Sequence, residues 1–99
     1  MQVTEVRIYP QQEKKVKAYA TITLDNEFVV HNLRIVEFEN GVKIFMPSRK
    51  MNDGSHKDVA HPITNDLRQK IEEKIVAAYA EKTGEKLTLK REKREEKQN

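Results

Sequence analysis

The feature that most constrains the fold is a strict alternation of side chains between Lys15 and Leu24. One parity is apolar and comprises Val16, Ala18, Ala20, Ile22 and Leu24. The other parity is polar or amphipathic and comprises Lys17, Tyr19, Thr21 and Thr23. Successive side chains of a β-strand point to opposite faces, so a period of two residues indicates a strand with one face in a core. We therefore place the clearest strand of the chain here.

Turn-forming dipeptides divide the neighbouring sequence into further strands. Asp25-Asn26 tolerates left-handed backbone angles and predicts a hairpin into the next run, and Asn40-Gly41 is the strongest tight-turn signal of the chain. The additional predicted strands are 3–9, 28–38, 42–46 and a short last one at 57–60. The sequence thus predicts an antiparallel meander of four to five strands.

After Pro62 the pattern changes to that of a helix. Thr64 or Asn65 can cap its start and Gly84 its end, which predicts a helix over residues 65–82. Its apolar stripe comprises Leu67, Ile71, Ile75 and Ala78, with Tyr79 at the border. Together these elements predict an α+β fold in which one C-terminal helix packs on one face of the sheet.

The predicted strand 28–38 is apolar on both parities. Phe28, Val30, Val36 and Phe38 share one parity, whereas Val29, Leu33 and Ile35 share the other. One helix covers only one face of a sheet, so the second apolar face needs another cover. We predict a two-fold dimer joined through the sheet, with Val29, Leu33 and Ile35 at the interface. The alternative is a monomer whose loops fold over that face.

Length and charge limit the class of protein. The 99 residues fit one domain with a small core, which we place at residues 1–84, followed by a charged tail at 85–99 that we expect to be frayed or disordered. No cysteine is present, and no apolar stretch suits a membrane span or an export signal. We expect a soluble, cytoplasmic protein with no membrane partner.

Residues suited to catalysis or metal binding do not form a recognisable motif. The spacing of His31, His56 and His61 matches no zinc-binding pattern, and Ser48 lacks the glycine context of a nucleophilic serine. Asp53, followed by Gly54, is better explained as a turn residue than as an acid or base. We therefore predict no enzyme activity, no metal, no cofactor and no small-molecule substrate.

A basic segment is the strongest functional signal. The net charge of the whole chain is +3, from 19 basic and 16 acidic residues. Residues 41–57 alone hold four basic side chains and one acidic side chain, Asp53, so the net charge of this segment is also +3. Within them, Pro47 to Lys57 is predicted as a loop whose cations, hydroxyls and amides suit phosphate groups. A merely solvated loop, in which Arg49 pairs with Asp53 or Asp58, is the alternative.

The chain resembles the stage V sporulation protein G (SpoVG) family of bacteria, whose members are also called septation proteins. The resemblance covers residues 1 to about 83 and is carried by four stretches in the same order and spacing. These are Val3-Thr4-Glu5-Val6-Arg7, Asp25-Asn26-Glu27-Phe28-Val29-Val30-His31-Asn32-Leu33, Met46-Pro47-Ser48-Arg49-Lys50 and Asp58-Val59-Ala60-His61-Pro62-Ile63.

The resemblance implies a small dimeric protein that binds DNA and RNA, regulates gene expression and is linked to septation and sporulation. Carried over to this sequence, it favours five basic positions as nucleic-acid contacts, namely Arg49, Lys50, Lys57, Arg68 and Lys70. The alternative function is a protein-interaction adaptor of cell division that does not bind nucleic acid.

Overall fold

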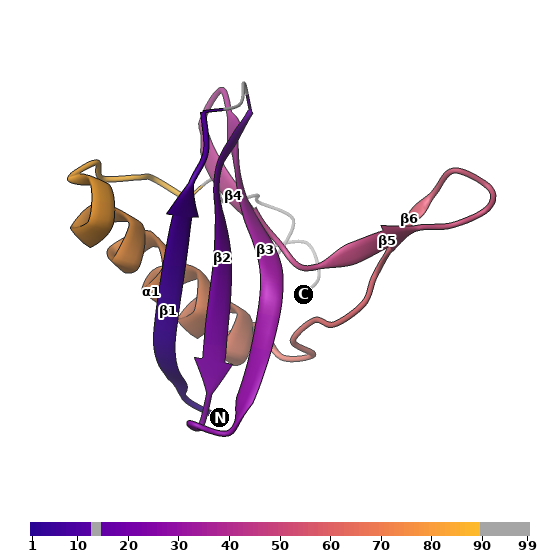
Figure 1. Cartoon of the computed structure of the whole chain (residues 1–99), viewed down its shortest axis with the longest axis horizontal. Coiled ribbons are helices and arrows are strands. Elements are labelled where there is room, and N and C mark those ends of the chain that lie inside the picture. The colour runs from indigo at the N-terminus through magenta and orange to yellow at the C-terminus, as the bar shows by residue number, and fades with distance from the viewer. Residues whose placement is uncertain (13–14, 90–99) are drawn as a thin grey trace, which may run out of the picture.

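The computed structural model describes residues 1–12 and 15–89, which form an antiparallel sheet, a short separate ribbon and a helix. The strands are β1 (Val3–Pro10), β2 (Val16–Leu24), β3 (Phe28–Phe38), β4 (Gly41–Phe45), β5 (Ser48–Lys50) and β6 (His56–Asp58), and the helix is α1 (Asn65–Thr83). β1 to β4 form one sheet in sequential order, with α1 across one face (Figure 1). The predicted α+β class and antiparallel meander are confirmed.

The turns of the meander follow the predicted dipeptides. Asp25 and Asn26 have φ of 52° and 55°, so the β2–β3 hairpin turns through two left-handed residues. Gly41, with φ of 142°, begins β4 directly after the turn that follows β3. Both conformations are costly for most side chains, which explains why these residue types stand there.

The core lies between the sheet and α1. β2 turns Ala18, Ala20, Ile22 and Leu24 toward the helix, as the alternation predicts. From α1, Ile71, Ile75 and Tyr79 are buried against them. Leu67 and Ala78 also pack against this cluster but remain partly exposed. The stripe predicted from the sequence is therefore the buried face of the helix.

Side chain and backbone caps fix both ends of α1. The Thr64 hydroxyl accepts a hydrogen bond of 3.2 Å from the Leu67 N–H, which satisfies one of the free amides of the first turn. Gly84 ends the helix with φ of 83°, and its N–H donates to the Ala80 carbonyl. Among the described residues no helix is both long and apolar enough to cross a membrane.

A bulge in β3 changes the alternation from which we predicted a strand with two apolar faces. Ala20 pairs with Leu33 but Ile22 pairs with Val30, so β3 holds one extra residue at this point, and Asn32 has φ of 70°. The bulge reverses the alternation, which lets Val30 and Leu33 both pack toward α1. Leu33 and Ile35 have an exposed fraction of 0%, so their predicted place at a dimer interface is wrong: both belong to the core.

The segment that follows β4 is a ribbon rather than the predicted loop. β5 and β6 form an antiparallel pair of their own instead of extending the meander. The pair projects from the edge of the sheet opposite β1 (Figure 1). Its strands are three residues long and lack an apolar face, which is why no alternating pattern predicted β5.

The residues after Gly84 differ from the expected frayed tail as far as the structure describes them. The Val42 N–H donates a 2.8 Å hydrogen bond to the Thr88 carbonyl, and Leu87 and Leu89 pack against the core. Glu85 pairs with Lys17 at 3.2 Å. The packed chain thus extends to Leu89, and the rest of the expected tail, residues 90–99, lies outside the described residues.

Candidate functional site

The β5–β6 ribbon arranges its cations on two faces. Arg49 lies opposite Lys57, and Lys50 lies opposite His56. Directly paired residues of an antiparallel ribbon share a face, and neighbours along the strand point to opposite faces. Arg49 and Lys57 therefore form one basic face, while Lys50 and His56 form the other. The ribbon is exposed along nearly its whole length, with only Ser48 partly buried.

A hydrogen-bonded turn holds the tip of the ribbon. The Met51 N–H donates to the Ser55 carbonyl at 2.7 Å, and Gly54 has φ of 91°. Asp53 accepts from both the hydroxyl and the N–H of Ser55, at 2.7 and 3.0 Å. These hydrogen bonds, the one from the hydroxyl foremost, lower the pKa of the Asp53 carboxyl. Asp53 is a turn residue, as the sequence predicts.

The cations of the ribbon have no carboxylate partner among the described residues. In the described part of the chain, the ion pairs join Arg7 to Glu5 and Lys17 to Glu37 and Glu85. Arg49, Lys50 and Lys57 take part in none of them, so the predicted alternative of an Arg49 pair with Asp53 or Asp58 is not what the structure shows. The charges of the ribbon are left available to an anion.

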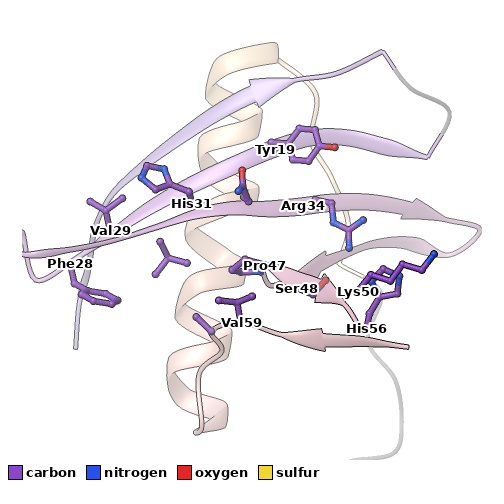
Figure 2. A pocket seen from close by; sticks show the side chains of 13 residues that line it. Tyr19, Phe28, Val29, His31, Arg34, Pro47, Ser48, Lys50, His56 and Val59 are labelled. Carbon is purple, nitrogen blue, oxygen red and sulfur yellow. The ribbon is translucent and has the colours of Figure 1, made fainter. Parts of the chain in front are cut away.

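A groove of about 560 Å³ lies between the ribbon and the sheet (Figure 2). It forms because β4 pairs with β3 only over Arg34 to Phe38, which leaves the edge of β3 opposite β2 without a paired strand over the first half of β3. The chain beyond β4 turns back along this gap, and the Val59 N–H donates to the Pro47 carbonyl at 2.7 Å. The base of the ribbon thus becomes the second wall.

The two ends of the groove differ in chemistry (Figure 2). At one end lie Phe28 and Val29, with exposed fractions of 59% and 47%, and Val59 at 64% stands on the facing wall. At the other end lie the cations Arg34 and Lys50 with the ring of His56. The groove therefore offers exposed apolar surface at one end and positive charge at the other.

The structure divides the five predicted nucleic-acid contacts among three surfaces. Lys50 lines the groove, Arg49 and Lys57 share the outer face of the ribbon, and Arg68 and Lys70 lie on α1. Neither Arg68 nor Lys70 lines the groove that Lys50 lines. Of the three predicted interface residues, only Val29 presents its side chain to solvent.

The three histidines make separate local contacts. The Thr21 hydroxyl lies 3.3 Å from Nδ1 of His31, His56 stands on the ribbon, and Nδ1 of His61 is 3.0 Å from the carbonyl of Pro62. Within residues 1–12 and 15–89, no three His, Cys, Asp or Glu side chains gather in a way that suits a metal ion.

Sequence reasoning missed Tyr19, His31 and Arg34 as groove residues. Tyr19 belongs to the polar parity of β2, and Arg34 interrupts an otherwise apolar stretch of β3. An arginine on a predicted central strand was the available signal, because such a charge must point away from the core. That Tyr19 and His31 share the groove with Arg34 follows only from the register between the strands, which the pattern of apolar and polar residues does not specify.

Known proteins with similar sequences agree with the resemblance. The SpoVG family profile matches residues 1–81. A protein of Clostridium botulinum (strain Alaska E43 / Type E3) named "Putative septation protein SpoVG" is 52% identical over 81 residues, which cover 81% of this chain and 89% of that protein. One of the same name from Anaeromyxobacter sp. (strain K) is 47% identical over 79 residues, covering 80% and 78%. The chain belongs to the SpoVG family.

Proposed function

We propose that this protein is a cytoplasmic regulator that binds DNA and RNA rather than an enzyme. The observation that carries the proposal is the β5–β6 ribbon, which projects from the edge of the sheet (Figure 1) and carries Arg49, Lys50 and Lys57. None of these cations has a carboxylate partner in the described part of the chain. Phosphate contacts dominate the affinity of most nucleic-acid-binding proteins, and cations without partners are what such contacts require.

The shape of the ribbon supports a contact along a phosphate backbone. A two-stranded ribbon fits into or beside a groove of a duplex, and here it presents basic side chains on both of its faces. Arg68 and Lys70 on α1 are proposed as further, more distant contacts. The names of the relatives support a place for this regulator in septation and, through the family, in sporulation.

The test is a titration of DNA and RNA oligonucleotides at several salt concentrations. We expect log affinity to fall linearly with log salt, and the double variant Arg49→Gln/Lys50→Gln to weaken binding and to reduce the slope by about 2 on duplex DNA. The matched control, Lys74→Gln/Lys82→Gln, removes the same charge from exposed positions on α1 and should change the slope little. Undiminished binding by the ribbon variant would contradict the proposed site, and an absence of binding would favour the adaptor function.

We also propose a homodimer, now placed at the apolar end of the groove. Phe28, Val29 and Val59 form an exposed apolar group beside the part of β3 whose edge opposite β2 is unpaired. Such a strand edge can pair with the same edge of a second copy. The two edges would run antiparallel about a two-fold axis and would bury the apolar side chains together.

Substitution of Val29 tests the dimer. Val29→Lys should yield a folded monomer of 11.6 kDa by analytical ultracentrifugation, because it sets two like charges against each other across the proposed interface. The control is Ile63→Lys, which places the same charge on an 89% exposed apolar residue outside the groove and should leave the dimer intact. A parent protein that sediments as a monomer at tens of micromolar would contradict the dimer outright.

A further inference from the structure

The face of the sheet that is turned away from α1, called the open face here, carries a row of flat side chains. Tyr9 pairs with Tyr19, Tyr19 pairs with Arg34, and Arg34 pairs with Phe45. Each of the four strands thus contributes one member at the same level of the sheet. Neighbouring strands are about 4.8 Å apart, so the row extends for about 14 Å.

Burial of the adjacent residues fixes the orientation of the row. Ile8, Ala20, Ile35 and Ile44 belong to the core beneath α1 and are at most 5% exposed. Each is the direct neighbour in sequence of one member of the row, and neighbours on a strand point to opposite faces. Tyr9, Tyr19, Arg34 and Phe45 must therefore lie on the open face. Figure 2 shows Tyr19 and Arg34 on adjacent strands of this face.

Cations are held beside the rings. The guanidinium carbon of Arg34 lies 5.5 Å from the centre of the Phe45 ring, and Nζ of Lys43 lies 5.9 Å from that of Phe38. The two phenylalanine rings meet edge to face, with centres 6.3 Å apart and an angle of 87°. These contacts restrain the aromatic and cationic groups at one end of the row, so that they are already oriented before a ligand arrives.

The charge of the open face selects an anionic occupant. Arg34 has no carboxylate partner among the described residues, and Lys50 faces the same groove from the ribbon. Arg7 also lies on this face but is paired with Glu5 at 2.9 Å. A second copy of the chain, laid face to face, would bring like charges together, whereas a phosphate backbone would neutralise them.

We infer that the open face binds single-stranded nucleic acid, with unpaired bases stacked on Tyr9, Tyr19 and the Arg34–Phe45 pair while the backbone continues toward Lys50 and the ribbon. The inference rests on the proposed nucleic-acid binding and adds the class of strand. A four-stranded sheet stacks two or three bases in this way, and each base presents a ring face whatever its identity. In a duplex the ring faces are covered by neighbouring base pairs, so this row serves unpaired strands alone.

The test compares one sequence as a single strand and as a duplex. The affinity of Tyr9→Leu/Tyr19→Leu for a 12-nucleotide oligothymidine should fall by about tenfold or more for each ring lost. The conservative variant Tyr9→Phe/Tyr19→Phe keeps both rings and should bind as the parent does. Binding of the corresponding duplex should be the same for all three proteins. Circular dichroism shows whether the leucine variant retains its fold.

Fluorescence gives a second measurement that needs no variant. The chain has no tryptophan and three tyrosines, and the third, Tyr79, is only 5% exposed in the core. Stacking of bases on Tyr9 and Tyr19 should quench most of the tyrosine emission when the single strand is added, and the duplex should quench little.

The outcomes separate this inference from the proposed function. Loss of all binding in Arg49→Gln/Lys50→Gln, together with equal single-strand binding by the leucine and phenylalanine variants, would leave the function standing and overturn the stacking row. Tyrosine emission unchanged by the single strand would overturn it as well. If the parent bound neither strand nor duplex, the proposed function itself would fail. A leucine variant that became monomeric without losing single-strand affinity would assign the open face to a second copy instead.

Discussion

A single residue, Asn32, decides which side chains of β3 enter the core. Its φ of 70° accommodates the extra residue of the bulge, and the alternation changes parity there. Without it, Leu33 and Ile35 would point away from α1, as a regular strand predicts. Asparagine is one of the few residues with a side chain that tolerates left-handed backbone angles, and this explains its position inside an otherwise apolar strand.

Substitution of Asn32 should expose the cost of this conformation. Asn32→Val should lower the free energy of unfolding by about 1–3 kcal/mol, because a β-branched residue is strained at positive φ. Asn32→Gly should change it by less than about 1 kcal/mol, since glycine adopts the conformation freely. Urea denaturation measures both. Equal effects of the two substitutions would show that the backbone angle at this position does not control the stability of β3.

At the level of the elements, the sequence predicted what local patterns can specify. Alternation predicted β2 and the turn dipeptides predicted its partners, while the spacing from Leu67 to Tyr79 predicted α1 to within one residue. β5 was missed because it is short and polar, and the predicted last strand at 57–60 overlaps β6 only at Lys57 and Asp58. The row across the open face was missed for another reason. Tyr9 and Phe45 are 36 positions apart in the chain, and they lie at the same level of the sheet only because of the registers of three strand pairs.

The ribbon should respond to acid through Asp53. Its pKa is lowered in the folded protein by the Ser55 hydrogen bonds, so the carboxylate stabilises the turn above the ordinary value of 3.8. That contribution disappears as pH falls from 3.8 through the lower pKa of the folded state. We expect amide exchange at Ser55, followed by NMR and corrected for the intrinsic effect of pH, to quicken in that range.

A variant without the carboxylate supplies the control. Asp53→Ala should show rapid exchange at Ser55 already at neutral pH, with no further acid transition, because the acceptor of both hydrogen bonds is gone. An acid transition at Ser55 that persisted in this variant would assign the pH response to another group.

At the scale of the whole molecule, the chain after α1 closes the helix side of the core. Leu87 and Leu89 pack against the buried cluster, and the Thr88 carbonyl accepts from Val42 on the edge strand β4. Backbone pairing between Leu89 and Val42 adds a parallel bridge beside this edge. The segment therefore covers apolar surface and one side of an edge strand, which a frayed tail would leave open to water.

Two truncations separate this packed segment from the charged sequence that follows. A chain ending at Leu89 loses only residues 90–99, which contain no apolar side chain, and its free energy of unfolding should change by less than about 0.5 kcal/mol. A chain ending at Lys86 also loses Leu87, Thr88 and Leu89 and should be about 1–3 kcal/mol less stable, because two partly buried leucines and the hydrogen bond to Val42 disappear. Thermal and urea unfolding of both chains measure the difference. If the chain ending at Lys86 were as stable as that ending at Leu89, the packing of this segment would contribute nothing to the fold, and the domain would end at Gly84 as the sequence alone predicts.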